Sequence, residues 1–214
     1  MRGQPQPSKE KPTVSSIVHL VRHGKVYNPG KILYGRLPGY HLSDRGRAMA
    51  EATAKSFAGH DVTFLAHSPL LRAEETARPI AEVTGLKPEV WEDIIEAGNR
   101  FEGLRVNAWN SQLWNPVRWP LLKDPSIPSW GEPYEQIAKR MLGAGKKAAE
   151  IAEGHEAILV SHELPIVMVQ RTVAGKPLPH NPATRKCALA SVTSLHYCGG
   201  EILDIYYSEP AQEI

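Results

Sequence analysis

The chain has 214 residues, of which 42% are hydrophobic and 22% charged, so it can bury the core of one α/β-sized domain. A formal net charge of +2 argues against a general binder of nucleic acid or anionic membranes, which needs a large basic excess. No apolar run reaches the roughly 18 residues that span a bilayer, and two cysteines, Cys187 and Cys198, are too few for a disulfide framework. These features predict a cytoplasmic protein with free thiols.

The predicted elements alternate between strands and helices along the chain. Residues 1–14 hold three prolines and almost nothing apolar, which indicates a mobile tail ahead of a single domain over residues 15–214. Short apolar runs rich in β-branched residues predict strands over residues 17–21, 62–66, 89–91 and 157–160. Helical patterns, with Ser43, Ser68 and Ser161 as expected capping residues, occupy residues 44–57, 69–83, 134–153 and 164–173.

The end of the chain predicts a hairpin, with strands over residues 188–197 and 201–207 joined through Gly199-Gly200. The whole order predicts an α/β fold, namely a three-layer sandwich with a mainly parallel sheet, helices on both faces and the hairpin at an antiparallel edge. Residues 104–131 break the alternation and hold four of the five tryptophans. A loop of this length is interpreted as a lid over the functional site, the alternative being a flap that covers only core.

Common cofactor and metal motifs are missing or stand in the wrong context. A GxGxxA string at residues 143–148 lies inside a predicted helix and does not follow a strand, so it does not indicate a dinucleotide site. The sequence has no HExxH, no GxSxG and no Cys/His cluster with zinc spacing. Single histidines near turn signals are interpreted as isolated surface or loop residues; these are His60, His155 and His180.

Polar side chains follow four of the predicted strands at their carboxyl ends, where ligands bind in an open parallel sheet. These residues are, in chain order, Arg22-His23-Gly24, Arg72 in the first turn of a helix, Glu96, and Ser161-His162-Glu163. The predicted sheet therefore brings two histidines, two arginines and a carboxyl group to one edge.

These motifs, in this order, resemble the histidine phosphatase superfamily, which has the phosphoglycerate mutase-like fold. The resemblance spans residues 15–207. The motifs that carry it are Arg22-His23-Gly24, Ser68-Pro69 followed by Arg72-Ala73 and Thr76-Ala77, Ile95-Glu96 ahead of Phe101-Glu102-Gly103, and Val160-Ser161-His162.

The resemblance implies a role for each matching residue. It implies that His23 is the nucleophile that becomes phosphorylated, and that Arg22, Arg72 and His162 form the phosphate pocket. Asn28 matches an asparagine that helps to bind phosphate in many members.

The resemblance also implies that Glu96 is the general acid and base. The segment from Glu96 to Gly103 is shorter than in several relatives, so other carboxyl groups stay open as alternatives, namely Glu92, Asp93 and Glu102. Glu163, which follows His162 at its strand end, is predicted to be a further substrate-binding residue.

Phosphoryl transfer to a histidine accounts for these residue types. An imidazole nitrogen attacks phosphorus only when it is unprotonated, and cations at Arg22, Arg72 and a protonated His162 would lower the pKa of His23 while neutralising phosphate oxygens. The leaving oxygen needs a proton, which a buried Glu96 with a raised pKa can donate. This chemistry calls for no cofactor and no metal, and the sequence lacks the acidic cluster that magnesium phosphatases place at strand ends.

The sequence therefore predicts a metal-independent phosphatase that hydrolyses phosphomonoesters through a phosphohistidine intermediate. Two alternatives stay open, a phosphoglycerate mutase-type phosphoryl transfer and a phospho-ligand binding or regulatory module with low turnover. The expected partners are a small phosphorylated substrate and inorganic phosphate as product, with no nucleic acid and no membrane.

Overall fold

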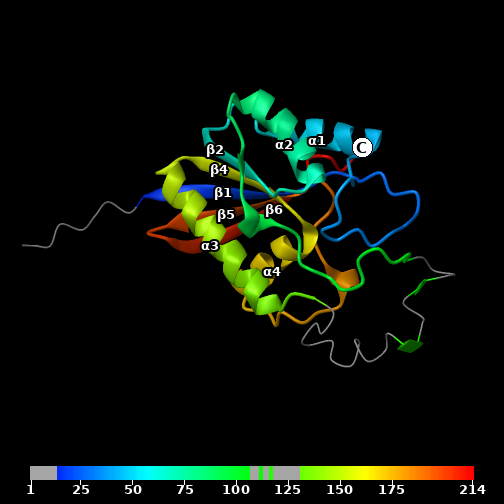
Figure 1. The fold of residues 1–214 in the computed structure, drawn as a ribbon. Coiled ribbons are helices and arrows are strands. Elements are labelled where there is room, and N and C mark those ends of the chain that lie inside the picture. The colour runs from blue at the N-terminus through cyan, green and yellow to red at the C-terminus, as the bar shows by residue number, and fades with distance from the viewer. Residues whose placement is uncertain (1–13, 107–110, 113–115, 118–130) are drawn as a thin grey trace, which may run out of the picture.

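The computed structural model describes residues 14–106, 111–112, 116–117 and 131–214, and it is built around one six-stranded sheet (Figure 1). The strands are β1 (Ser15–Arg22), β2 (Val62–His67), β3 (Glu89–Val90), β4 (Glu156–Ser161), β5 (Val192–Cys198) and β6 (Glu201–Ser208). Their order is β3-β2-β4-β1-β5-β6. The first four pair in parallel with one another, and β5 pairs antiparallel with both β1 and β6. The predicted mainly parallel sheet with a C-terminal antiparallel hairpin is confirmed.

The helices cover both faces of this sheet. They are α1 (Asp44–Ser56), α2 (Leu71–Thr84), α3 (Tyr134–Ala152) and α4 (Glu163–Val173), with short 3-10 turns η1 (Glu92–Ile94) and η4 (Pro182–Thr184). Successive residues of β1 point to opposite faces of the sheet. Leu20 packs in a buried cluster with Met141 of α3, whereas Val21 packs in a second cluster with Ile80 of α2. Helices α1 and α2 lie on one side and α3 and α4 on the other (Figure 1), which confirms the predicted three-layer sandwich.

The helix starts agree with the predictions only in part. Ser43 caps α1, since its Oγ accepts a hydrogen bond from the Gly46 amide at 3.1 Å. The predicted caps at Ser68 and Ser161 are wrong. Helix α2 begins only at Leu71, and Ser161, which ends β4, donates its hydroxyl to the carbonyl of Ile94 at 2.7 Å. Both serines are fully buried, so their hydroxyls are used in tertiary contacts and not at helix ends.

The start of the hairpin and the two unusual segments predicted from the sequence, the tail and the lid, remain to be located. The first hairpin strand begins at Val192 and not at residue 188, because Ala190 has a φ of 57°, which is incompatible with extended backbone. The predicted tail, except Val14, and the tryptophans of the predicted lid lie outside the described residues. Both ends of the lid segment are anchored, since Arg105 forms a β-bridge with Ile32 and Gly131 forms one with Asn99.

Among the described residues, no helix has the length and apolar character to cross a membrane.

Candidate active site

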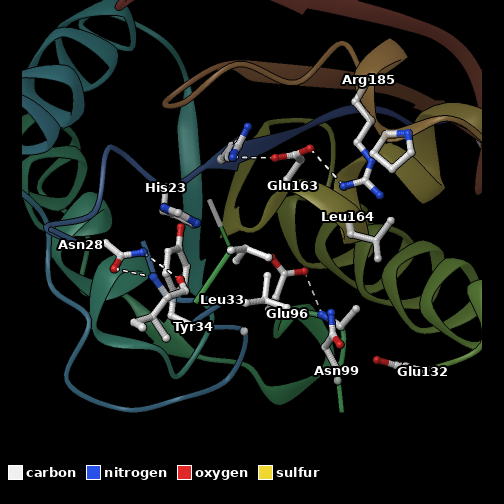
Figure 2. Close-up of a pocket in the computed structure, with 18 of the residues that line it drawn as sticks. His23, Asn28, Leu33, Tyr34, Glu96, Asn99, Glu132, Glu163, Leu164 and Arg185 are labelled. Atoms are coloured by element: carbon white, nitrogen blue, oxygen red, sulfur yellow. Dashed lines mark hydrogen bonds and ion pairs between the residues drawn. The ribbon is translucent and has the colours of Figure 1, made fainter. Parts of the chain in front are cut away.

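A pocket of about 540 Å³ opens where β1 and β4 end and α4 begins (Figure 2). Five of the seven predicted site residues line it, namely Arg22, His23, Asn28, Glu96 and Glu163. The other two lie directly behind its wall. The ring of His162 is 5.2 Å from that of His23, and the Arg72 guanidinium lies 4.7 Å from the centre of the Tyr34 ring, which itself lines the pocket. The structure thus brings all seven residues together.

His23 is held in one orientation and one tautomer. Its amide donates to the carbonyl of Ser161 at 3.1 Å, which ties the residue to the neighbouring strand end. Its Nδ1 lies 2.8 Å from the carbonyl of Gly24, an acceptor only, so Nδ1 carries the proton and Nε2 keeps its lone pair. Burial, followed by the charges of Arg72 and Arg22, lowers the pKa of His23 well below 6.5. The side chain is therefore a neutral imidazole with a nucleophilic Nε2 at neutral pH.

His162 is fully buried and is oriented by Ser68. The Nε2 atom of His162 lies 2.7 Å from the Ser68 hydroxyl, which also accepts a weaker hydrogen bond from the Leu70 amide at 3.4 Å. Among the contacts of the described residues, Nε2 is the acceptor within reach of the Ser68 hydroxyl proton, so we assign the hydroxyl as donor to Nε2 and the ring proton of His162 to Nδ1. Burial, helped by Arg72 and His23, lowers the pKa of His162 well below 6.5. This direction opposes the expected protonated state of His162, because burial penalises the charged ring.

The two arginines are anchored by part of each guanidinium group. Arg22 pairs with Glu163 at 2.6 Å and donates to the carbonyl of Cys187, while Arg72 donates to the carbonyl of Gly35 at 2.7 Å. In the described part of the chain, four buried polar side-chain atoms have no hydrogen-bond partner, and three of them are Arg22 Nε, Arg72 Nε and His162 Nδ1. Buried donors are rarely left unpaired, and an anionic oxygen is the acceptor that such a group fits best.

Of the four carboxyl groups considered from the sequence as the acid, Glu96 is the one that lines the pocket (Figure 2). Glu132 and Glu163 also line it, but both are paired with arginines. Its Oε1 accepts a hydrogen bond from the Ala97 amide at 2.8 Å, and burial raises its pKa. The three alternatives line no part of this pocket. Glu92 and Asp93 are exposed on η1, and Glu102 accepts the Arg36 amide at 2.9 Å. The geometry therefore favours Glu96 as the proton donor.

The remaining predicted residues hold the pocket wall in place. The side chain of Asn28 donates to the carbonyl of Ile32 at 2.8 Å and accepts the Ile32 amide at 3.0 Å, so it closes the loop that carries Tyr34. Glu163 lies between two cations, at 2.6 Å from Arg22 and 3.1 Å from Arg185 (Figure 2). A carboxylate in this position fixes the orientation of the Arg22 guanidinium.

Sequence reasoning missed a network that supports the acid. Arg36 donates to the carbonyl of Glu96 at 2.7 Å and pairs with Glu132 at 2.9 Å, and Glu132 also accepts from Arg140 at 2.8 Å. Hydrogen bonds and charge from Arg140, together with Arg36, lower the pKa of Glu132 although burial works in the opposite direction. No local pattern predicts the contacts of Arg36, since Glu96 and Glu132 lie 60 and 96 positions further along the chain, whereas Glu132 and Arg140 are only 8 positions apart. Ser68 was signalled only by its place in the Ser68-Pro69 motif.

Comparison with known proteins gives a consistent set of matches. Residues 18–204 match the family model described as histidine phosphatase superfamily (branch 1). Uncharacterized protein Rv0525 of Mycobacterium tuberculosis is 50% identical over 194 residues, which cover 91% of this chain and 96% of that protein. A probable phosphoglycerate mutase GpmB of Yersinia enterocolitica is 29% identical, covering 82% and 83% of the two chains. Among solved structures, the mycobacterial glucosyl-3-phosphoglycerate phosphatase Rv2419c with VO3 superposes with a TM-score of 0.68 at 27% identity, covering 90% and 96%.

Proposed function

Because the chain belongs to the histidine phosphatase superfamily, we propose that it is a metal-independent phosphatase that hydrolyses phosphomonoesters through a phosphohistidine intermediate. One observation carries the proposal. Three buried groups, Arg22 Nε, Arg72 Nε and His162 Nδ1, have no hydrogen-bond partner among the described residues. The His162 ring lies 5.2 Å from the His23 ring, and both arginines lie close enough to lower the pKa of His23. A phosphoryl group bound there would satisfy all three donors at once and would meet a nucleophile of the correct protonation state.

In the first step, the Nε2 lone pair of His23 attacks the phosphorus atom of the substrate. The N–P bond forms while the ester P–O bond breaks, and the leaving oxygen takes the proton from the Glu96 carboxyl group. The two arginines and the Nδ1–H of His162 bind the non-bridging oxygens, where negative charge is spread in the transition state. Glu163 acts through Arg22 by fixing its guanidinium, and Asn28 acts by ordering the loop of Tyr34.

In the second step, the Glu96 carboxylate takes a proton from a water molecule that attacks the phosphorylated His23. The N–P bond breaks, inorganic phosphate leaves, and the imidazole returns to its neutral state. The same residue thus serves as acid and then as base, as microscopic reversibility requires. The proposal is supported by the similarity to the mycobacterial phosphatase, which was solved with VO3.

A mutase is the second candidate, because several relatives of 27–29% identity are named probable phosphoglycerate mutase. A mutase uses the same nucleophile but returns the phosphoryl group to the substrate and not to water. Incubation of the pure protein with 3-phosphoglycerate and a trace of 2,3-bisphosphoglycerate separates the two functions. We expect slow release of inorganic phosphate, whereas rapid formation of 2-phosphoglycerate would establish the mutase.

The phosphohistidine itself is tested by acid and base stability of the trapped protein. The wild type, denatured during turnover of p-nitrophenyl phosphate, should retain phosphate that is labile in acid and stable in base. His23→Ala should give no trapped phosphate and no more than a trace of the wild-type rate, while His155→Ala, an exposed histidine outside the pocket, should behave as wild type. An acid-stable or base-labile adduct would contradict the intermediate, and full activity of His23→Ala would contradict the nucleophile.

A further inference from the structure

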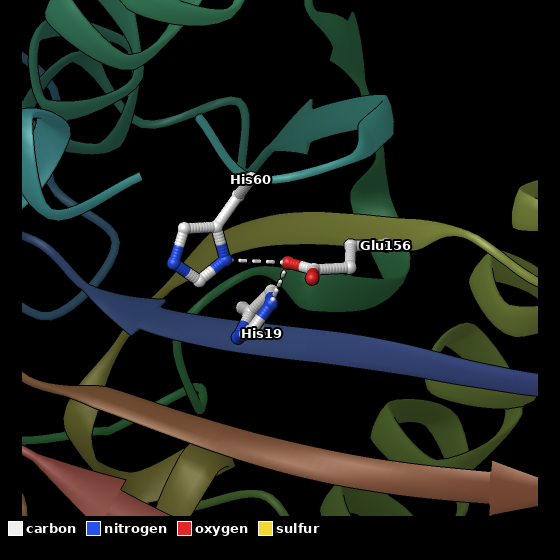
Figure 3. Close-up of side chains that lie close together, drawn as sticks. All are labelled: His19, His60 and Glu156. Atoms are coloured by element: carbon white, nitrogen blue, oxygen red, sulfur yellow. Dashed lines mark hydrogen bonds and ion pairs between the residues drawn. The ribbon is translucent and has the colours of Figure 1, made fainter. Parts of the chain in front are cut away.

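A second cluster of polar side chains, formed by His19, His60 and Glu156, is shown in Figure 3, and none of its members lines the pocket. His19 comes from β1, Glu156 is the first residue of β4, and His60 lies in the connection between α1 and β2. One carboxylate oxygen, Oε2 of Glu156, lies 2.8 Å from Nε2 of His19 and 2.8 Å from Nδ1 of His60. His60, interpreted from sequence as isolated, is therefore half-exposed but paired.

The buried member of this cluster occupies an unusual position. His19 is only 5% exposed and lies on the face of the sheet where Val21 packs into apolar core. The Phe57 ring packs against it edge-on, with ring centres 5.1 Å apart, and also against His60 at 5.7 Å. An aliphatic residue would fill this position without desolvating an imidazole. The imidazole is thus placed in apolar surroundings with one nitrogen directed at the carboxylate. An apolar shell of this kind limits the access of water to a metal site.

We propose that His19, His60 and Glu156 bind a divalent transition metal ion of the zinc type. Two imidazole nitrogens and one carboxylate oxygen form a donor set that zinc accepts. The ligand atoms all lie within 4.8 Å of one another. Bonds of about 2.0–2.2 Å in a tetrahedral site place ligand atoms roughly 3.4 Å apart, so the two 2.8 Å contacts would need to open by about 0.6 Å. Movement of the half-exposed His60 side chain can open one contact, and a small rotation of the Glu156 carboxylate can open the contact to the buried His19. Water can fill the fourth position.

The hydrogen bond between His19 and Ser194 can form both with and without a bound metal ion. Nδ1 of His19 lies 2.8 Å from the hydroxyl of Ser194 on β5. Without metal, Nε2–H of His19 donates to Glu156, and the Ser194 hydroxyl donates to Nδ1. With metal on Nε2, the ring proton moves to Nδ1 and the Ser194 oxygen accepts it, while the proton of His60 moves to its own Nε2. Ser194 thereby orients the ligand, as the hydrogen-bond partners of metal-bound histidines do in zinc proteins.

The test uses the full-length chain without an affinity tag, in a buffer free of phosphate. We expect calorimetric titration with ZnCl2 to give one equivalent per chain, and Co²⁺ to give a visible spectrum of tetrahedral type without a thiolate charge-transfer band. His60→Ala and Glu156→Gln should each weaken Zn²⁺ binding more than tenfold, and Ser194→Ala by about tenfold. His155→Ala is the matched control, because this neighbouring histidine pairs with Asp61 outside the cluster and should leave binding unchanged.

A second comparison separates this cluster from the phosphate pocket, which holds two histidines of its own. His23→Ala should keep the full Zn²⁺ affinity, and Zn²⁺ should raise the melting temperature of the wild type but not of Glu156→Gln. The proposal would be overturned if neither ion bound saturably, if His60→Ala and Glu156→Gln bound as wild type, or if binding were lost in His23→Ala. A cobalt–thiolate band would assign the ion to a cysteine and would also overturn it.

Discussion

Replacing Glu96 by Gln should slow substrates with poor leaving groups far more than substrates with good ones. The change preserves local structure, because the Gln Oε1 can still accept the Ala97 amide that Glu96 accepts at 2.8 Å. What is lost is the proton that the buried carboxyl group holds through its raised pKa. General acid catalysis contributes about 10²–10⁴-fold, so kcat/KM for an alkyl phosphate should fall by that factor. The fall for p-nitrophenyl phosphate should be less than about tenfold, since nitrophenolate leaves without protonation.

The assay is steady-state release of inorganic phosphate from both substrates across a range of pH. In the wild type, the rate for the alkyl phosphate should fall as pH rises through the pKa of Glu96, because the deprotonated group cannot donate, and Glu96→Gln should remove this alkaline limb. Matched controls are Glu92→Gln, Asp93→Asn and Glu102→Gln, which lie outside the pocket. Equal loss for both substrates in Glu96→Gln would refute the assignment, and a leaving-group dependence in Glu102→Gln would transfer the role to that residue.

Three further predictions concern phosphate binding, the acid limb and backbone packing. Arg72→Ala should lower kcat/KM and vanadate affinity by about 2–5 kcal/mol, or roughly 30- to 4,000-fold, because a phosphate oxygen loses its buried partner; an unchanged inhibition constant for vanadate would contradict this. The acid limb of kcat/KM should lie below pH 6.5, since burial and the Arg72 charge lower the pKa of His23 and the rate falls only when that ring is protonated. Arg72→Ala should move the limb to higher pH, and a wild-type limb above 6.5 would count against a neutral nucleophile. Gly46→Ala should destabilise the fold by about 1–3 kcal/mol, because its Cβ would clash with the backbone oxygen of Lys25, whereas Gly143→Ala, with open space around it inside α3, should stabilise it by roughly 1 kcal/mol. Urea unfolding measures both, and equal effects of the two substitutions would refute the packing argument.

The sequence predicts the order and type of the main elements because their signals are local. Strand β1 is a run of β-branched residues, and α1 has an apolar stripe behind a serine cap, so neither depends on distant contacts. The capping residues of α2 and α4 were not predictable in the same way, although the predicted starts at residues 69 and 164 lie within two residues of Leu71 and Glu163. Ser68 is drawn away from a capping position by His162, 94 positions further along the chain, and no local pattern reports such a partner.

In the candidate site too, features that depend on local sequence are predictable, whereas those that depend on distant contacts are not. Residues at strand ends, such as His23 and Glu163, follow from strand prediction together with the rule that parallel strands end at one edge. Protonation depends on burial, which no local pattern reports, and burial lowers the pKa of His162 and so opposes the protonated state expected there. Pairs across the fold, such as Arg36 with Glu132 or His60 with Glu156, join residues 96 positions apart in both cases and carry no sequence signature.

Strand β1, which leads into the proposed nucleophile, lies between β4 and β5, so the site depends on strands from the end of the chain. All seven predicted site residues lie between residues 22 and 163, yet the Arg22 amide bonds to Ser191, and its guanidinium to the carbonyl of Cys187, 165 positions away. A chain that ended before β5 would contain every one of these side chains, but β1 would become an unpaired edge prone to association with other chains. Pairing between strands so distant in sequence is slow to form. During synthesis or refolding, phosphate binding at Arg22 should therefore emerge only after the last strands have docked, so catalytic competence would report on the final event of folding.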